Sequence, residues 1–154
     1  MDKSRLIDDI NLQIKNLKRL NDEMNEVLNK VKGEPTFIEI RAVASILQDF
    51  YSGIEKIFER IALVIDKHLP KGENWHSELL LQMKEPLTNI RSPIISEDLF
   101  KNLKKYLDYR HLFRHLYGFE LKWERIKPLC LTMEEVLNKF IKEIDKFLDI
   151  LKEE

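Results

Sequence analysis

Hydrophobic residues recur every three or four positions along most of the chain, the spacing of one face of an α-helix. The first pattern ends at Gly33-Glu34-Pro35, because glycine can end a helix and proline cannot continue one. Its heptad-like stripe, in which Asn21 fills a gap, consists of Ile10, Ile14, Leu17, Met24, Leu28 and Val31. A second helix is predicted from about Thr36, a residue suited to an N-cap, to about Leu69. Its core stripe reads Ile40, Val43, Leu47, Phe50, Ile54, Ile57, Ile61, Val64 and His68.

The middle of the chain predicts a broken helical unit. Residues from Trp75 to about Arg91 have helical character that is interrupted near Pro86. Ser92-Pro93 then separates this unit from the next helix, since a residue before proline disfavours helical backbone angles.

Two further helices complete the pattern. One starts near Ser96, because a capping serine followed by two acids suits the positive end of the helix dipole, and it is expected to end at Tyr117-Gly118. The last helix is expected to start between residues 120 and 128, with Thr132 as an alternative cap, and to run to about Leu151.

These elements predict an all-α fold. No segment has the alternation of a strand, and no internal repeat or low-complexity tail is present. Long helices joined by short turns indicate an up-and-down four-helix bundle with an extra broken helix, in one domain spanning residues 1–154. The composition, 34% charged and 44% hydrophobic, fits such a protein.

The sequence also indicates the compartment. No apolar run approaches the roughly 20 residues that cross a bilayer, and the first residues lead into a mixed polar pattern rather than a signal sequence, so we expect no membrane segment. The single cysteine, Cys130, excludes an internal disulfide and suits a reducing environment. A cytoplasmic location is expected.

The charge is unevenly distributed. The net charge of −1 argues against a general nucleic-acid binder. Residues 101–127, however, hold eight basic and three acidic side chains, a local charge of +5. A basic patch on an acidic body can guide a polyanion to one place. A solvated helix face with excess lysine remains the alternative.

Residues 110–117 concentrate two arginines, two histidines and a tyrosine. If the segment is helical, Arg110 and Arg114 lie one turn apart on one face, with His111 and His115 on an adjacent stripe. Like charges at that spacing repel, so the cluster makes sense where an anion such as a phosphate is held and acted on by a group that titrates near neutrality.

Arg110, four intervening residues, His115, one residue and Tyr117 together resemble the R-x4-H-x-Y motif of HepT-like toxins, a branch of the HEPN ribonucleases. His111 fits the position after the arginine, which is usually polar in that family. Residues 49–55 and 75–80 also resemble stretches of one HepT-like subgroup, so the resemblance covers most of the chain from about Ile40 onward. HEPN domains are helical bundles, in agreement with the pattern.

The resemblance implies a metal-independent endoribonuclease with no cofactor, in which Arg110 and His115 are catalytic. Arginine binds phosphate oxygens and histidine serves as acid or base. The resemblance also implies a homodimer in which the motifs of the two chains face one shared cleft. His111 and Arg114 are second candidates that either bind substrate phosphate or are simply solvated. No metal-binding motif, P-loop or dinucleotide turn is present, so no metal site is expected.

Arg110 and His115 also have alternative, structural interpretations. Arg110 would otherwise pair with Asp108 or Glu120, and His115 would be a hydrogen-bonded histidine near a helix end. Both lie off the main apolar stripes, so alanine at either position is expected to abolish cleavage while leaving the helical fold intact.

Tyr117 has its own implied role. HepT-like toxins are paired with a MntA-like minimal nucleotidyltransferase antitoxin, which silences the nuclease by transferring AMP to this tyrosine. A bulky anionic adduct beside arginines would occupy the place of RNA phosphate. The alternatives are a tyrosine that only fills the end of the bundle, and a non-catalytic subunit that binds the nucleotidyltransferase.

Five further polar residues are expected to have structural or surface roles. His68 lies on an apolar stripe and His76 follows Trp75 at a helix start, so both are expected to be structural. Asp49, Tyr51 and Glu55 are spaced to form a polar patch, and ordinary surface placement is expected for them.

Overall fold

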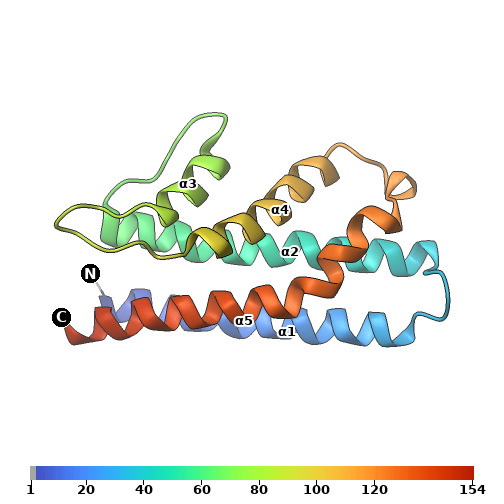
Figure 1. The fold of residues 1–154 in the computed structure, drawn as a ribbon, viewed down its shortest axis with the longest axis horizontal. Helices are drawn as coiled ribbons and strands as arrows, with labels where there is room; N and C mark the ends of the chain where they lie inside the picture. The colour runs from blue at the N-terminus through green and yellow to red at the C-terminus, as the bar shows by residue number, and fades with distance from the viewer. Residues whose placement is uncertain (1–2) are drawn as a thin grey trace.

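The fold, described for residues 3–154 by a computed structural model, is all-α, as the hydrophobic pattern predicts (Figure 1). Five α-helices and two short irregular helices follow one another: α1 (Lys3–Lys30), α2 (Phe37–Ile61), the π-helix η1 (Ala62–Asp66), α3 (Trp75–Lys84), α4 (Glu97–Phe113), the 3-10 helix η2 (Gly118–Glu120) and α5 (Trp123–Glu153). No helix within residues 3–154 combines the length and hydropathy needed to cross a bilayer.

Helices α1, α2, α4 and α5 form the predicted up-and-down bundle, each running opposite to the one before it (Figure 1). α1 packs against α2 and α5, and α4 packs against both α2 and α5. The short helix α3 is the extra element, and it packs on α2 and α4. This arrangement places the start of α3 and the end of α4 beside the C-terminal half of α2.

A continuous apolar core joins the four long helices. Edge-to-face aromatic pairs cross it, with ring centroids 5.3 Å apart for Phe50 and Tyr106 and 5.8 Å apart for Phe58 and Phe140. Gly53 lets α1 approach α2 closely, because a Cβ at this position would lie 2.8 Å from the Leu17 side chain.

The second helix ends earlier than predicted. Its α-helical part stops at Ile61, continues as η1, and is terminated by Lys67 in the left-handed conformation (φ 59°) rather than near Leu69. His68 is therefore exposed and off the apolar face, contrary to its predicted place on the core stripe. The wider π-helical turn changes the register of the last residues, which the simple periodicity does not reveal.

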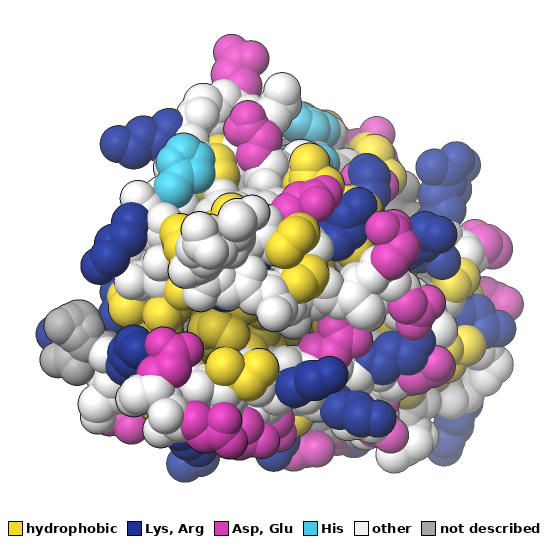
Figure 2. Space-filling view, turned by 60° about the vertical axis from the view of Figure 1, so that its left-hand side comes forward, with side chains coloured by type: hydrophobic (Ala, Val, Ile, Leu, Met, Phe, Trp, Pro, Cys, Tyr) yellow, Lys and Arg dark blue, Asp and Glu magenta, His cyan; other side chains and the backbone are white. Residues whose placement is uncertain are grey.

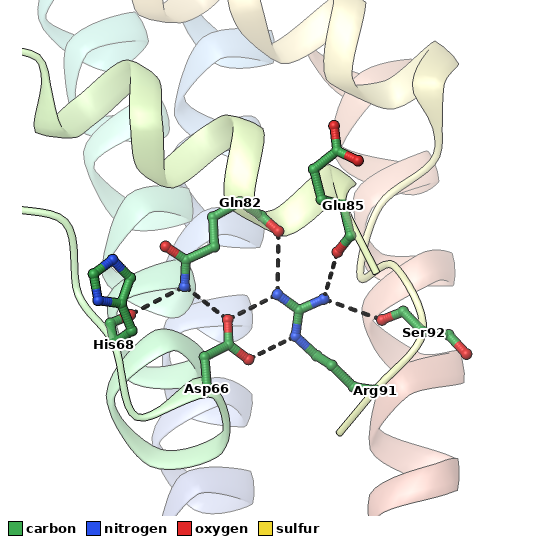
Figure 3. Close-up of polar contacts among 6 residues, drawn as sticks. All are labelled: Asp66, His68, Gln82, Glu85, Arg91 and Ser92. Atoms are coloured by element: carbon green, nitrogen blue, oxygen red, sulfur yellow. Dashed lines mark hydrogen bonds and ion pairs between the residues drawn. The ribbon is translucent and has the colours of Figure 1, made fainter. Parts of the chain in front are cut away.

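The unit after α2 is also shorter than predicted, since α3 ends at Lys84 and residues 85–96 are a loop rather than helix up to Arg91. Arg91 ties this loop to η1 (Figure 3). Its Nε and Nη2 donate to the two carboxylate oxygens of Asp66, at 2.6 and 2.7 Å. The remaining N–H groups donate to the backbone carbonyls of Gln82, Glu85 and Ser92. All five donors of this buried guanidinium are satisfied.

Helix α4 ends at Phe113, four residues before the predicted boundary, and Arg114 to Leu116 form a turn. Helix α5 starts at Trp123, inside the predicted range, and contains Pro128, near which Figure 1 shows the helix to bend. Thr132 is not a cap: its hydroxyl donates to the Pro128 carbonyl at 2.8 Å, within the helix.

A groove of about 720 Å³ lies between the loop around residues 90–96 and the C-terminal half of α5. Figure 2 brings this end of the bundle forward and shows hydrophobic side chains gathered in a hollow across the face, with charged side chains around it. Arg110 and His115 are not among the residues that line this groove.

Candidate functional site

The end of α4, the start of α3 and the C-terminal half of α2 meet in a buried polar cluster formed by Arg110, His76 and Glu55. Arg110 Nη1 donates to Glu55 Oε1 at 3.0 Å, and His76 Nδ1 lies 2.8 Å from Glu55 Oε2. Arg110 Nη1 and His76 Nδ1 are 3.4 Å apart. These three residues come from the three separate stretches that carry the family resemblance, so the fold brings all three stretches to one place.

The cluster corrects two expectations. Arg110 is only 9% exposed and Glu55 only 3%, so Arg110 is not off the buried face and Glu55 is not a surface residue. Arg110 pairs with Glu55 and not with Asp108 or Glu120, the partners of the alternative interpretation: Asp108 pairs with Lys104, and Glu120 accepts from the Tyr117 backbone. Replacing Arg110 by alanine would leave a buried carboxylate without its cation, so from the structure we expect this change to destabilise the fold.

Tyr51 is also buried, in contrast to the predicted surface patch, whereas Asp49 is exposed as expected. Burial, followed by the charge of Glu55, raises the pKa of the Tyr51 phenol above its ordinary range. Glu59, one turn after Glu55, is half-buried, and its pKa is raised by burial and by the Glu55 charge. A carboxyl group with a raised pKa beside an arginine is a feature typical of functional sites.

The two buried arginines, Arg91 and Arg110, differ in how many of their N–H donors form hydrogen bonds. Arg91 uses all five N–H donors within the protein, as a structural guanidinium does. Arg110 uses only Nη1: its Nε is buried without a partner, and Nη2 makes no hydrogen bond to the described part of the chain. Glu55 thus fixes Arg110 through Nη1 and leaves Nη2 available for an anion, whereas Nε is buried.

Aromatic contacts extend the cluster. The Trp75 and His76 rings lie 3.7 Å apart at 31°, and the His111 ring meets the His76 ring edge-on at 5.7 Å. Partial burial lowers the pKa of His111, and the charges of His76, Arg114 and Arg110 lower it further. The neutral form of His111, which can accept a proton, is therefore favoured near neutral pH.

The other motif residues lie beyond the helix. Arg114 and His115 are exposed in the turn after α4, where the His115 amide donates to the Leu112 carbonyl at 3.1 Å. Within one chain the histidines gathered at Arg110 are His76 and His111, and no hydrogen bond joins His115 to Arg110 among the described residues. His115 is thus an exposed side chain outside the buried cluster.

Tyr117 is exposed in the short segment that leads into η2. Its backbone amide donates to Glu120 Oε1 at 2.7 Å, and the Glu120 amide donates back to the Tyr117 carbonyl at 2.9 Å. Its ring stacks on Phe119, with centroids 5.2 Å apart and an angle of 8° between the planes. The phenol is therefore accessible, and the interpretation that Tyr117 only fills the bundle end is wrong.

Two residues of this cluster were not predicted as functional: Glu55 and His76. Both lie in stretches of the sequence that resemble the family, and this resemblance could have pointed to them. A glutamate and a histidine at these positions do not by themselves indicate a function. Among residues 3–154, no group of three His, Cys, Asp or Glu side chains is arranged to hold a metal ion.

Comparison with known proteins gives one result. A family model described as "HepT-like protein" matches residues 42–151, well over half of the chain and from nearly the residue where the resemblance was expected to begin. No curated protein and no solved structure matches the chain.

Proposed function

The chain belongs to the HepT-like family of the HEPN superfamily, and on this premise we propose that it is the metal-independent endoribonuclease toxin of a toxin–antitoxin pair. The observation that carries the proposal is the Arg110 guanidinium, which Glu55 holds through Nη1 while Nη2 forms no hydrogen bond within the described residues. A buried cation with free, fixed donors is suited to the charge that develops on a phosphoryl group.

RNA supplies its own nucleophile for this reaction. The ribose 2′-oxygen attacks phosphorus and gives its proton to a base, the P–O5′ bond breaks, and the leaving 5′-oxygen takes a proton from an acid. We assign the acid or base role to His115 and phosphoryl stabilisation to Arg110. His111, whose lowered pKa favours the neutral form, and Arg114, an exposed cation, are assigned to the binding of the RNA backbone.

A homodimer completes this site. Arg110 and His115 do not meet within one chain, and His115 lies exposed at the end of α4. A two-fold axis near this end of α4 would place two copies of each residue around one basic cleft, which supplies both an acid and a base. Bound RNA and the dimer contacts would offset the repulsion between the four arginines.

Tyr117 is the proposed point of control. Its exposed phenol lies two residues after His115, so a nucleotidyltransferase antitoxin of the MntA type can reach it. Transfer of AMP would add a phosphate next to Arg114 and occupy the position of the RNA backbone. The cytoplasm is the compartment in which RNA and such an antitoxin are both present.

Incubation of the purified dimer with single-stranded RNA in EDTA tests this function. Wild type should cleave, and His115→Ala and Arg110→Lys should each lower the cleavage rate by at least about 100-fold, the scale of a general acid–base contribution for His115 and of a lost transition-state donor for Arg110. Leu12→Ala, on the exposed face of α1, serves as the control variant. If wild type binds a nucleotidyltransferase but leaves RNA intact, the chain is instead a non-catalytic partner subunit.

A further inference from the structure

The loop between α4 and α5 carries two stacked aromatic rings in an exposed position. Tyr117 is 71% exposed and Phe119 77%, and the two rings lie nearly parallel at 5.2 Å. Single exposed apolar side chains are common, but two aromatic rings stacked together in solvent are a contiguous apolar surface that usually marks a site of interaction. Each ring has one face covered by the other, and the high exposure leaves the outer faces open.

The protein holds this pair in place from three sides. Glu120 exchanges two hydrogen bonds with the Tyr117 backbone, and Leu121, directly after η2, is buried in the core. On the third side, the Arg41 guanidinium of α2 lies so close to Gly118 that a Cβ there would collide with it. The exposure of the two rings is therefore fixed by the fold of the loop and is not the result of a loose chain end.

The charges around the pair favour one kind of ligand. Five cations lie on the loop or on the helices that flank it and form no ion pair within the described part of the chain: Arg41, Arg114, Lys122, Arg125 and Lys127. The acids within residues 114–127 are Glu120, which is used in the loop itself, and Glu124. Aromatic faces beside unpaired arginines and lysines are how proteins bind single-stranded nucleic acid, with bases on the rings and phosphates on the cations.

We propose that Phe119, stacked on Tyr117, forms a binding subsite for an unpaired nucleobase of single-stranded RNA. This inference rests on the proposed ribonuclease function and names the substrate form that the site accepts. The subsite lies four residues beyond His115 along the chain, so the base that it holds belongs to a nucleotide near the cleaved phosphate. A base in a duplex is already stacked and covered, so only an unpaired base can reach the ring.

Binding of a fully 2′-O-methylated single-stranded oligonucleotide tests the subsite, because the blocked 2′-oxygen prevents cleavage. Fluorescence anisotropy should show affinity about 10-fold or more lower for Phe119→Ala, as expected for one lost base–aromatic contact. Phe119→Trp should retain the affinity. Leu12→Ala removes another exposed apolar side chain, on α1, and should have no effect.

A second arm shows whether the ring contacts a base. An oligonucleotide series with one abasic position each should contain a position at which wild type loses affinity and Phe119→Ala does not. The proposed subsite would be contradicted if Phe119→Ala bound the oligonucleotide with wild-type affinity. It would also be contradicted if each abasic position reduced the affinity of both proteins equally. Loss of antitoxin binding with unchanged RNA binding would also overturn it and would assign the rings to a protein partner.

Cleavage activity separates this inference from the function on which it rests. If wild type cleaves RNA in EDTA while Phe119→Ala binds and cleaves like wild type, only the subsite is wrong. If wild type does not cleave RNA at all, the proposed function is wrong, whatever the binding results are.

Discussion

Glu55 holds Arg110 by one nitrogen only: Oε1 accepts from Nη1 at 3.0 Å, while Nε and Nη2 form no hydrogen bond with the described protein. The second oxygen of the same carboxylate lies 2.8 Å from His76, so the carboxylate itself is fixed on both sides. This arrangement costs stability, because a buried guanidinium with unused donors is incompletely compensated for the loss of water. An anion bound at Arg110 would supply the missing contacts.

Glu55→Gln should destabilise the fold and reduce RNA cleavage. The amide keeps the side-chain volume but leaves the Arg110 charge without its counter-ion, which should cost about 3 kcal/mol of unfolding free energy in chemical denaturation. Glu26→Gln, which removes one partner of the exposed pair with Lys30, is the matched control and should change stability by less than about 1 kcal/mol. Equal stability of the two variants would show that the buried pair is not formed in solution.

The two buried arginines should respond differently to replacement by lysine, with Arg91→Lys losing mainly stability and Arg110→Lys losing mainly cleavage. Arg91→Lys removes the bidentate pair with Asp66 and three carbonyl contacts, so we expect a loss of about 3 kcal/mol or more in unfolding free energy. Arg110→Lys keeps the charge beside Glu55 and should lose about 1 kcal/mol of unfolding free energy. It should nevertheless lose nearly all cleavage, because lysine lacks the planar guanidinium that binds phosphate oxygens. Denaturation and cleavage rates would be measured for both proteins. A fully active Arg110→Lys would contradict the role of the guanidinium.

His111 should titrate below its ordinary pKa of about 6.5 in an NMR titration. Burial lowers its pKa first, followed by the His76 charge. Since the folded-state pKa lies below the unfolded one, the neutral ring contributes stability that is present above about pH 6.5 and is lost as the pH falls through the folded-state pKa. His76→Gln should raise the pKa of His111 by removing one of these charges. A value at or above 6.5 in wild type would contradict the packing seen here.

Tyr117 should carry AMP after coexpression with a MntA-like nucleotidyltransferase. Mass spectrometry of the purified protein should show one or more AMP units on this residue, and growth arrest by the toxin should disappear. Tyr117→Phe removes the acceptor oxygen but keeps the ring on Phe119, so it should stay toxic despite the antitoxin. Full neutralisation of this variant would mean that inhibition works through complex formation or through another residue.

The helices were predictable because their apolar stripes are long and regular, and the capping residues Thr36 and Ser96 act as expected. Helix ends were predicted less well. Helix α4 ends after Phe113, although the next glycine in the sequence is Gly118. Helix α2 continues as a π-helix, and no residue in the sequence predicts this change.

The candidate site was predictable only in part. Arg110, His115 and Tyr117 were found by their spacing, but the partner of Arg110 lies 55 residues away in sequence. Glu55 follows Ile54 on a helix whose neighbours are apolar, and only the packing of α4 and α3 against α2 shows that its carboxylate is turned inward. A buried charge pair between two helices forms only where the packing of the helices brings the two side chains together. This packing cannot be derived from the sequence of one chain.

Analysis of the ends that cleavage leaves on RNA tests the central claim most directly. With the 2′-oxygen as nucleophile and no metal, the protein in EDTA should produce a 2′,3′-cyclic phosphate on one fragment and a 5′-hydroxyl on the other. A 2′-deoxy nucleotide at the cleaved position should stop the reaction, and His115→Ala should slow it by at least about 100-fold. Fragments that carry 5′-phosphates, cleavage that requires a divalent metal, or intact RNA with wild-type protein would contradict the account.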